Sequence, residues 1–371
     1  MKVTLERAEL VKALAHVHRV VERRSTIPIL ANVLIRAGKN GIELKATDLD
    51  LEIVETVPAE VKQASATTVP AHIFYDIVRK LPEGSQVELQ SGSDRGSLQV
   101  RAGRSRFTLQ TLPETDFPDI AAGELPHRFK LAASDLKRLV DKTQFAISTE
   151  ETRYYLNGIY LHVIDDKSAK LRAVATDGHR LAQVDLAAPK GSSGMPGVIV
   201  PRKTVAEVQR LLEDAGEEVE IELSPAKIRF SLGPVVLTSK LIDGTFPDYA
   251  RVIPVGNDKT LVVDKGEFSS AVDRVSTVSS ERGRAVKLSV AGGKLTLSVV
   301  NPDSGSATEE IEVEYGSEPL DIGFNSRYLL DITNQIEGEK ATLKLADPGS
   351  PTLLQDSEPA GALYVLMPMR V

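Results

Sequence analysis

One turn-forming stretch occurs twice in the sequence and divides the chain into repeats: Ala175-Thr176-Asp177-Gly178-His179-Arg180-Leu181 and Ala46-Thr47-Asp48-Leu49-Asp50-Leu51. Both copies lie between runs that alternate apolar and polar residues, which is the period of a half-buried β-strand. The two copies are 129 positions apart. Because the earlier copy lacks both the Gly and the His, we interpret the shared Thr-Asp pair as turn chemistry, in which the Asp side chain caps its own backbone.

The elements around this turn repeat in the same order. An amphipathic helix, a group of strands, a second amphipathic helix and further strands lead to Phe117-Pro118-Asp119, and the same order leads to Phe246-Pro247-Asp248, again 129 positions later. A third pass begins near Phe268, with Asn301-Pro302-Asp303 in the place of the Thr-Asp turn. Each unit can hold its own core, unlike a solenoid repeat. The sequence therefore predicts an α+β protein with three domains of one fold, each with two helices on antiparallel sheets: residues 1–127, 128–254 and 255–371.

Helical spacing of apolar residues predicts the buried faces of the two helices in the first repeat. These residues are Leu10, Val11, Leu14, Val17 and Val21 for the first helix, and Ile73, Phe74, Ile77, Val78 and Leu81 for the second.

Composition excludes several classes of protein. The chain has no cysteine, which excludes disulfides, thiolate catalysis and the usual structural zinc sites. It has no apolar run of about 18 residues and begins with charged residues where a signal peptide would be apolar, so we expect a cytoplasmic protein. Its net charge is −7, from 45 basic and 52 acidic residues. An acidic balance speaks against a simple nucleic-acid-coating protein, but it is compatible with one basic face.

Basic residues are concentrated on the predicted helices. On the first helix, Lys12, His16, Arg19 and Arg23 are spaced to share one face, and Arg24 follows them. Other helices carry Arg79, Lys80, Lys137, Arg138, Lys142, Arg202, Lys203 and Arg210. A solvated face explains any one of these helices. Their recurrence favours helices that neutralise phosphates without reading a base sequence.

Little in the sequence indicates catalysis. Asp177 and His179 form the one plausible catalytic pair, and the other histidines have no metal-ligand spacing. Phosphate-loop, dinucleotide-binding and nucleophile-elbow motifs do not occur. We favour a role for His179 in a turn or a pocket wall over that of a general base or metal ligand.

Two further stretches leave alternatives open. The cluster Arg153-Tyr154-Tyr155 is either part of a strand with buried tyrosines or an exposed loop able to stack on bases. The apolar C-terminal stretch Leu366–Val371 is either a last strand with a frayed end or an adaptable groove wall for a partner peptide.

Over essentially its whole length the chain resembles the β sliding clamps, the processivity subunits of bacterial DNA polymerase III. The resemblance rests on the repeated Phe-Pro-Asp motif, on residues 175–181 and on these stretches: Arg104-Ser105-Arg106-Phe107, Arg153-Tyr154-Tyr155-Leu156-Asn157-Gly158, Val200-Pro201-Arg202-Lys203, Gly323-Phe324-Asn325 and Met367-Pro368-Met369-Arg370. Glu150 stands where the family often has Gln.

The resemblance implies a head-to-tail ring of two subunits, whose helices line a hole around duplex DNA and whose sheets form the rim. Such a protein has no catalytic activity and needs neither cofactor nor metal. It holds double-stranded DNA without sequence specificity and binds short apolar tails of the replicative polymerase, the clamp loader and repair proteins in a pocket between its second and third domains. Two rival hypotheses are a hydrolase that uses Asp177 and His179, and an adaptor that uses the pocket without binding DNA.

By this resemblance, three groups of residues carry the function. The DNA-binding residues are Arg24, Arg79, Arg153, Tyr154, Tyr155, Arg202 and Lys203. The partner-peptide pocket consists of Leu156, Thr176, Gly178, His179, Arg180, Leu181, Pro247, Arg251, Val252, Tyr328, Val365, Met367, Pro368, Met369 and Arg370. The dimer interface pairs Arg104, Arg106 and Leu109 of one subunit with Thr277, Val278, Glu309 and Glu310 of the other, where opposite charges suit a head-to-tail joint.

Overall fold

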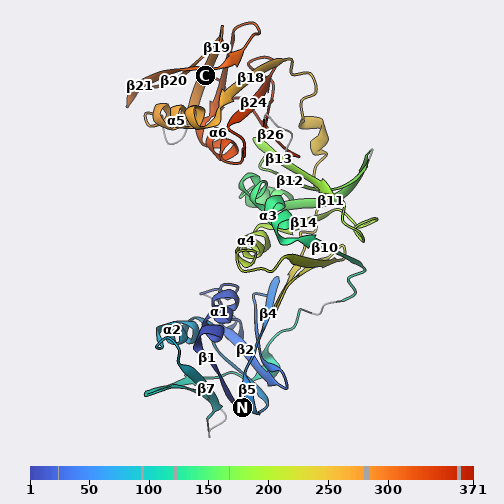
Figure 1. Ribbon diagram of the computed structural model, residues 1–371, viewed down its shortest axis with the longest axis vertical. Coiled ribbons are helices and arrows are strands. Elements are labelled where there is room, and N and C mark those ends of the chain that lie inside the picture. Colours follow the sequence, from blue (N-terminus) through green and yellow to red (C-terminus); the bar gives the residue numbers. More distant parts are fainter. Residues whose placement is uncertain (24, 93–95, 121–122, 167, 280–283, 357–360) are drawn as a thin grey trace. The chain divides into compact units, whose positions relative to one another are not determined.

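The computed structural model describes residues 1–371 except 24, 93–95, 121–122, 167, 280–283 and 357–360 (Figure 1). The described residues form two compact units: unit 1 comprises Met1–Ser134 and Ala206–Leu241, and unit 2 comprises Asp135–Val205 and Ile242–Val371. The division passes through the middle repeat, within helix α4 (Arg202–Leu211). None of the described helices is long and apolar enough to cross a membrane.

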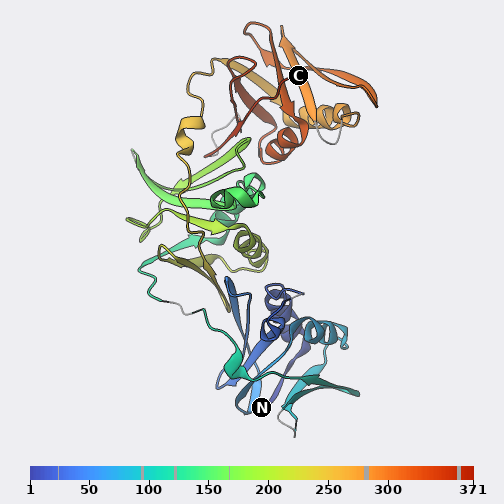
Figure 2. The ribbon, with the colours of Figure 1, turned by 180° about the vertical axis from the view of Figure 1, so that it is seen from behind.

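Unit 1 contains two antiparallel sheets and a pair of helices. The first sheet has the order β5-β1-β7-β8-β9, with β5 (Glu60–Gln63), β1 (Lys2–Glu6), β7 (Gln86–Ser91), β8 (Ser97–Ala102) and β9 (Ser105–Gln110). The second has the order β10-β15-β16-β17-β4-β3-β2-β6, with β10 (His127–Ala132), β15 (Glu218–Leu223), β16 (Lys227–Leu232), β17 (Val235–Lys240), β4 (Leu51–Val57), β3 (Gly41–Thr47), β2 (Asn32–Gly38) and β6 (Ser65–Pro70). Helices α1 (Arg7–Val17) and α2 (Ala71–Lys80) lie side by side (Figures 1 and 2).

Unit 2 has the same kinds of elements. Its larger sheet has the order β14-β11-β12-β13-β26-β25-β24-β18-β22, with β14 (Val198–Pro201), β11 (Gly158–Asp166), β12 (Ser168–Thr176), β13 (Arg180–Ala187), β26 (Ala362–Leu366), β25 (Thr352–Asp356), β24 (Lys340–Leu345), β18 (Lys259–Asp264) and β22 (Glu314–Tyr315). Its smaller sheet has the order β21-β20-β19-β23, with β21 (Gly305–Glu312), β20 (Lys294–Asn301), β19 (Ala285–Ala291) and β23 (Leu320–Asn325). Helices α5 (Lys265–Ser276) and α6 (Ser326–Thr333) lie side by side, and α3 (Ala133–Asp141) begins at the boundary with unit 1.

The strand orders reveal three copies of one topology, as the sequence pattern predicts. The sets β1-β7-β8-β9, β10-β15-β16-β17 and β18-β24-β25-β26 correspond to one another, and so do β4-β3-β2-β6, β13-β12-β11-β14 and β21-β20-β19-β23. All of these pairings are antiparallel. The domain boundaries 1–127, 128–254 and 255–371 themselves stay a prediction.

Successive repeats share continuous sheets. Strand β17 of the middle repeat pairs with β4 of the first, and β26 of the third pairs with β13 of the middle one. In the first joint Leu237 lies opposite Ile53, and in the second Tyr364 lies opposite Ala182; all four residues are buried. The middle repeat therefore contributes one sheet to each compact unit, which is why three repeats form two units.

The repeated Thr-Asp turns make the same hydrogen bonds, which confirms the predicted turn chemistry. Asp48 Oδ1 accepts from the backbone N–H groups of Asp50 and Leu51 at 3.0 and 2.7 Å. Asp177 Oδ1 accepts from those of His179 and Arg180 at 2.9 and 3.1 Å. In the third repeat Asn301 Oδ1 accepts from Asp303 N at 3.0 Å, so an amide replaces the carboxylate. The turn is a property of the fold that does not depend on His179.

Two predictions about the first pair of helices need correction. Helix α1 ends at Val17, so Val21, although buried, belongs to the segment after the helix. In α2, Phe74 and Val78 are buried as expected, but 53% of Ile73 is exposed.

Candidate functional site

Unit 2 contains a hollow of about 330 Å³, called the main hollow below. Its lining residues are Arg153, Tyr155, Leu156, Thr176, Gly178, Arg180, Leu181, Pro247, Asp248, Tyr249, Val252, Val365 and Met367. They come from the short helix η4 (Glu151–Leu156), the turn between β12 and β13, the end of β26 and the segment around η5 (Tyr249–Val252). Because β13 and β26 pair directly, one sheet brings together parts of the lining that are far apart in the sequence.

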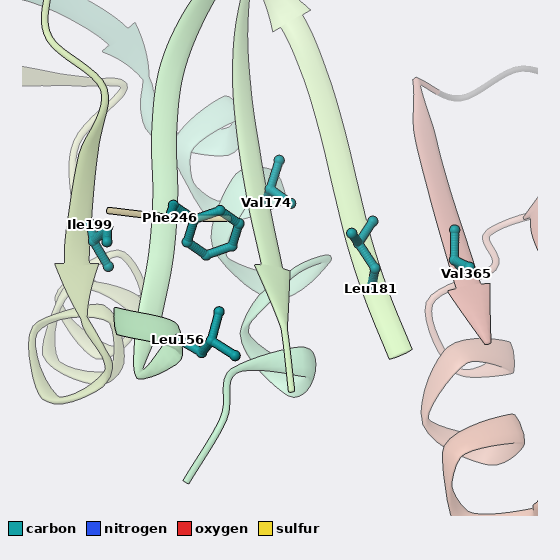
Figure 3. Close-up of a cluster of buried hydrophobic side chains, with 6 residues drawn as sticks. All are labelled: Leu156, Val174, Leu181, Ile199, Phe246 and Val365. Atoms are coloured by element: carbon teal, nitrogen blue, oxygen red, sulfur yellow. The ribbon is translucent and has the colours of Figure 1, made fainter. Parts of the chain in front are cut away.

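A cluster of buried apolar side chains is continuous with the main hollow. It consists of Leu156, Val174, Leu181, Ile199, Phe246 and Val365, on neighbouring strands and their flanking segments (Figure 3). Three of these residues, Leu156, Leu181 and Val365, also line the hollow. Each buried aliphatic side chain of this kind contributes about 1.5–3 kcal/mol to stability. The same packing that stabilises unit 2 thus also gives the hollow its apolar wall.

The turn at 176–180 forms a polar rim. Thr176 Oγ1 donates to Arg180 O at 2.7 Å and accepts from Gly178 N at 3.1 Å. Gly178 has a φ of +89°, and a Cβ at this position would lie 2.5 Å from Arg153 Nη1. The backbone conformation therefore favours glycine here, and the absence of a Cβ leaves room for the Arg153 guanidinium group.

Arg180 joins β13 to α6. Its guanidinium group donates to Asp177 Oδ2 at 3.1 Å, to Asp331 Oδ2 at 2.5 Å and to Phe145 O at 2.7 Å. Its Cζ atom lies 4.2 Å from the centre of the Tyr328 ring. Arg180 is only 9% exposed, so these partners compensate a charge that has lost most of its water.

The C-terminal stretch is fixed by backbone hydrogen bonds. Met367 N donates to His179 O at 2.9 Å, and Met369 N donates to Gly323 O at 2.7 Å. A Cβ on Gly323 would lie 2.4 Å from Val371 Cγ1, so the end of the chain packs closely on β23. The end of the chain is therefore not frayed, and Met367 contributes to the lining of the main hollow; its role as a groove wall for a partner peptide stays a prediction.

The structure brings together nine of the fifteen residues predicted for the pocket: Leu156, Thr176, Gly178, Arg180, Leu181, Pro247, Val252, Val365 and Met367. The other six are His179, Arg251, Tyr328, Pro368, Met369 and Arg370, which do not contribute to the lining. His179 lies beside Tyr328, with ring centres 6.3 Å apart, and Arg251 is exposed and pairs with Asp248 at 2.7 Å. The sequence reasoning missed Asp248 and Tyr249 as lining residues, although Asp248 is the last residue of the recurring Phe-Pro-Asp motif and Tyr249 directly follows it.

The predicted DNA-binding residues that the structure describes either are exposed or line the main hollow. Tyr154 is 52% exposed on η4, which is not a strand, whereas Tyr155 packs against the apolar cluster. Arg153 lines the hollow and binds both carboxylate oxygens of Glu150, at 2.8 and 2.6 Å. The remaining basic residues are exposed: Arg79 on α2, and Arg202 and Lys203 in the first turn of α4. Arg24 lies outside the described residues.

The predicted basic face on the first helix is wrong in two respects. Arg19 and Arg23 lie beyond the end of α1 at Val17, so helical spacing does not align them with Lys12 and His16. His16 is also engaged by acidic residues of unit 1: its Nδ1 lies 2.8 Å from Glu55 Oε2 and its Nε2 lies 3.4 Å from Asp214 Oδ2. The hydrogen bond with Glu55 raises the pKa of His16 above its ordinary value, against the effect of burial.

A second hollow, of about 320 Å³, lies in unit 1 between α2 and β9. Its lining is Ile73, Asp76, Ile77, Lys80, Leu81, Ser105 and Phe107. On β9, Phe107 is 37% exposed while the predicted interface residue Leu109 is buried; Arg104 and Arg106 are exposed. The exposed Ile73 therefore lies beside a second exposed apolar residue at the edge of a sheet.

The acidic residues predicted for the dimer interface are paired within unit 2. Glu309 binds Arg274 through both oxygens, and Lys294 Nζ lies 2.7 Å from Glu310 Oε1. Thr277, exposed, and Val278, half-buried, directly follow α5. Any partner that binds this edge through Glu309 or Glu310 must compete with these internal ion pairs.

The geometry at Asp177 and His179 does not form a catalytic pair. Asp177 Oδ1 accepts from two backbone amides and Asp177 Oδ2 accepts from Arg180, so the carboxylate is used by the turn. In the part of the chain that the structure describes, no group of three or more His, Asp or Glu side chains could hold a metal ion. The arrangement is that of an apolar binding hollow with a polar rim.

Comparison with known proteins assigns this chain to a family. The DNA polymerase III beta subunit models match in succession: the N-terminal domain over residues 1–121, the central domain over 130–248 and the C-terminal domain over 250–370. The beta sliding clamp of Caulobacter vibrioides is 54% identical, with 100% of both chains covered.

Comparison with solved structures identifies the same family. The sliding clamp (DNA polymerase III subunit beta) of Bartonella birtlesii, bound to griselimycin, is 58% identical with a TM-score of 0.98, and all of both chains is covered. A Caulobacter crescentus beta sliding clamp, with polyethylene glycol bound to a region proposed for tethering β motifs, is 54% identical with a TM-score of 0.98, covering 100% of this chain and 99% of the other.

The chain belongs to the β sliding clamp family, the β subunits of bacterial DNA polymerase III. Its three repeats are the β-clamp domains of that family, and a dimeric ring is what family membership implies. It is a non-catalytic processivity subunit of DNA replication rather than an enzyme, and its family implies DNA and a DNA polymerase as partners.

Proposed function

We propose that two copies of this protein close into a ring around duplex DNA, and that the main hollow holds short apolar segments of the replicative polymerase, the clamp loader and repair proteins. The observation that carries the proposal is the hollow itself: an apolar wall formed by core residues, with guanidinium groups and a tight turn at its rim. A small number of polar groups around an apolar cavity of this size is typical of ligand sites. The protein would act in the cytoplasm, where bacteria replicate DNA.

The lining indicates what the hollow binds. Leu156, Leu181 and Val365 offer an apolar surface, and Arg153 and Arg180 offer hydrogen-bond donors at its edge. An extended peptide with a bulky apolar residue fits this chemistry, because a few buried side chains then supply most of the affinity. Because the relative from Bartonella birtlesii is bound to griselimycin, we propose that this hollow binds griselimycin as well.

The repeated topology supports closure by strand pairing. Strands β17, β26 and β9 occupy equivalent places in the three repeats, and so do β4, β13 and β21. Two of the three equivalent pairings, β17 with β4 and β26 with β13, occur within the chain. Among the described strands, β9 and β21 are left at the edges of their sheets. The third pairing is then formed between β9 of one copy and β21 of another, which makes a head-to-tail dimer with two such joints.

Phe107 provides the apolar centre of this joint. By the equivalence of the hairpins, Phe107 on β9 takes the place of Leu237 on β17 and Tyr364 on β26, which are both buried where repeats join. Exposed Phe107 and Ile73 would be covered in the same way. Arg104 and Arg106 would approach the acidic strand that carries Glu309 and Glu310, with Thr277 and Val278 nearby.

The affinity for DNA should come from basic residues rather than from the net charge. The proposed contacts are Arg24, Arg79, Arg153, Tyr154, Tyr155, Arg202 and Lys203. Contacts of Arg and Lys with phosphates read no sequence and weaken as salt rises, because they release counterions. This suits a ring that must slide over any sequence.

Sedimentation tests the ring. The wild type should sediment as a dimer at micromolar concentration, and Phe107→Glu as a monomer, because a charge cannot be buried in the joint. Val255→Glu is the matched control, since Val255 is fully exposed and lies on neither edge strand. A monomeric wild type, or a Phe107→Glu variant that remains dimeric, would count against the proposed closure.

Retention on DNA tests the clamp itself. After loading, the wild type should remain on a nicked circle and slip off once the circle is cut. Charge reversal at Arg24 and Arg153 should weaken salt-sensitive DNA binding. If that double variant keeps full retention, the protein does not hold DNA through these residues. If the wild type binds peptide but never DNA, it acts as an adaptor.

A further inference from the structure

One wall of the main hollow is formed by a segment whose backbone makes few hydrogen bonds to the rest of unit 2. Ile242 N donates to Ile199 O at 3.0 Å, and the Asn257 side chain donates to Lys344 O at 2.7 Å. Between these two points, the backbone hydrogen bonds that the structure describes are local, such as Tyr249 N to Pro247 O and Ile253 N to Ala250 O. This connecting segment carries the lining residues Pro247, Asp248, Tyr249 and Val252. Something other than the backbone must therefore hold that wall in place.

The side chain of Tyr249 links this segment to the larger sheet through hydrogen bonds. Its Oη lies 2.9 Å from His162 Nε2 on β11 and accepts a hydrogen bond from Arg172 Nη1 on β12 at 3.2 Å. Arg172 is in turn fixed by Asp185 on β13, through bonds of 2.6 and 2.8 Å to the two carboxylate oxygens. The hydroxyl group thus binds residues on two adjacent strands of the larger sheet, β11 and β12, and Arg172 extends this network to the third, β13.

The donors and acceptors of this network are matched. Arg172 can only donate, so the Tyr249 proton is available to His162 Nε2. Burial, reinforced by the neighbouring Arg172 charge, lowers the pKa of His162 to about 4. His162 is therefore neutral near pH 7, and its Nε2 accepts. Each group in the series from Asp185 to His162 has a partner of the right kind.

Aromatic packing also fixes the position of the Tyr249 ring. The Tyr160 ring stacks on Phe246, with centroids 4.9 Å apart, and on His162, with centroids 4.5 Å apart. The Tyr249 ring meets His162 and Phe246 edge-on. Tyr160 itself lies against Gly197, where any Cβ would be 2.3 Å from its Oη. The stack leaves little room for the Tyr249 ring to move.

We propose that Tyr249 is a positioning residue for the partner-binding hollow: its hydroxyl, held by His162 and Arg172, fixes the wall formed by Pro247 and Val252 before a peptide arrives. This proposal rests on the proposed function of the main hollow. A wall fixed in advance lowers the entropy that a bound peptide must lose, and this preorganisation raises affinity without a new contact. The part of Tyr249 that matters for positioning is thus its hydroxyl, which points to the sheet.

The direct test removes the hydroxyl alone. Tyr249→Phe keeps the ring and its packing, and we expect it to bind a fluorescein-labelled peptide ending in Leu-Phe on the order of fivefold more weakly, because both hydrogen bonds of the hydroxyl, with His162 and Arg172, are lost. His162→Leu should weaken binding by a similar factor, and His162→Gln, which keeps an acceptor, should restore part of the loss. Fluorescence anisotropy measures each affinity on the full-length protein. The double variant Tyr249→Phe/His162→Leu should bind no worse than the weaker-binding single variant, because each substitution alone already removes the hydrogen bond between Tyr249 and His162.

A matched control separates positioning from general stability. Tyr315→Phe likewise removes a buried tyrosine hydroxyl, which donates to Glu318 O at 2.5 Å, at a site that does not line the hollow. It should lower the thermal midpoint without changing peptide affinity. Hydrogen exchange adds a readout specific to the wall: amides in 249–253 should exchange faster in Tyr249→Phe and unchanged in Tyr315→Phe.

The outcomes distinguish this proposal from the function on which it rests. If the wild type fails to bind both the peptide and griselimycin, the proposed function fails. If the wild type binds and Tyr249→Phe binds equally well, the positioning role is overturned while the hollow remains the binding site. Equal losses of affinity in Tyr249→Phe and Tyr315→Phe would also overturn it, because the effect would then follow stability alone.

Discussion

The guanidinium carbon of Arg180 lies 4.2 Å from the centre of the Tyr328 ring, and the same group binds Asp331 on the next turn of α6. Arg180 belongs to β13 in the middle repeat, and Tyr328 belongs to the third. The contact therefore adds a buried cation–π and ion-pair link to the sheet that joins β13 to β26. Such a planar, multiply bonded site is one where Lys cannot substitute for Arg.

Arg180→Lys should destabilise the protein by about 1–3 kcal/mol, because the single ammonium cannot reach Asp177, Asp331 and Phe145 O together while stacking on Tyr328. Peptide affinity should fall too, since Arg180 lines the main hollow. Thermal unfolding and anisotropy measure the two effects. Arg128→Lys is the control for stability: Arg128 forms an exposed pair with Glu220, so the change should be close to zero. Equal losses of stability in Arg180→Lys and Arg128→Lys would show that the buried contacts of Arg180 stabilise the protein no more than an exposed ion pair does.

Gly178→Ala should destabilise the turn by about 1 kcal/mol or more, because Gly178 has a φ of +89° that an L side chain adopts only with strain. The new Cβ would also displace the end of the Arg153 side chain, which lies 2.5 Å from its position. We therefore expect peptide affinity to fall several-fold. Gly216→Ala is the control, because a Cβ there meets no atom within 4 Å. A Gly178→Ala variant with unchanged melting and binding would refute this account of the turn.

The repeated fold could be predicted from the sequence because its signals are local and occur more than once. Thr47 with Asp48 and Thr176 with Asp177 form the same hydrogen-bonded turn, and two copies in register identify a unit that one copy cannot. The pocket residues were predicted from a family resemblance, and the structure brings most of them to one hollow.

The errors arise where function depends on distant parts of the chain. No local pattern shows that α1 ends at Val17, or that His16 meets Asp214, which lies 198 positions away. The same holds for Tyr249, whose partners His162 and Arg172 lie on strands far before it. Helical spacing predicted a buried Ile73, because periodicity identifies an apolar face without saying whether the protein itself or a partner covers it.

His16 should make the stability of unit 1 depend on pH. Its pKa is raised in the folded state, chiefly by the hydrogen bond with Glu55, so the folded protein binds the proton more tightly than the unfolded chain. This contribution is complete below the unfolded pKa of about 6.5 and is lost as pH rises through the higher folded value. His16→Gln should therefore lower the thermal midpoint more at pH 6 than at pH 8.5, by the equivalent of about 1 kcal/mol.

Lys12 is a second cation near this pair, with its Nζ 3.8 Å from Asp214 Oδ2. A difference between wild type and His16→Gln that stays constant over this range would show that His16 stabilises the fold by packing rather than by its charge. The titration of His16 followed by NMR gives its pKa directly.

Deletion of Met369–Val371 should weaken peptide binding by about 2 kcal/mol, while the dimer survives. Met367 is the tail residue that lines the hollow, and the bond from Met369 N to Gly323 O at 2.7 Å fixes the chain just beyond it. Gly323→Ala tests the same contact without deletion, because its Cβ would lie 2.4 Å from Val371 Cγ1 and 2.6 Å from Met369 O, so the tail must shift. Anisotropy and sedimentation measure binding and assembly in parallel. Because β9 and β21 lie outside the tail, a loss of the dimer on deletion would show that the tail supports ring closure, contrary to the pairing proposed for those two edges.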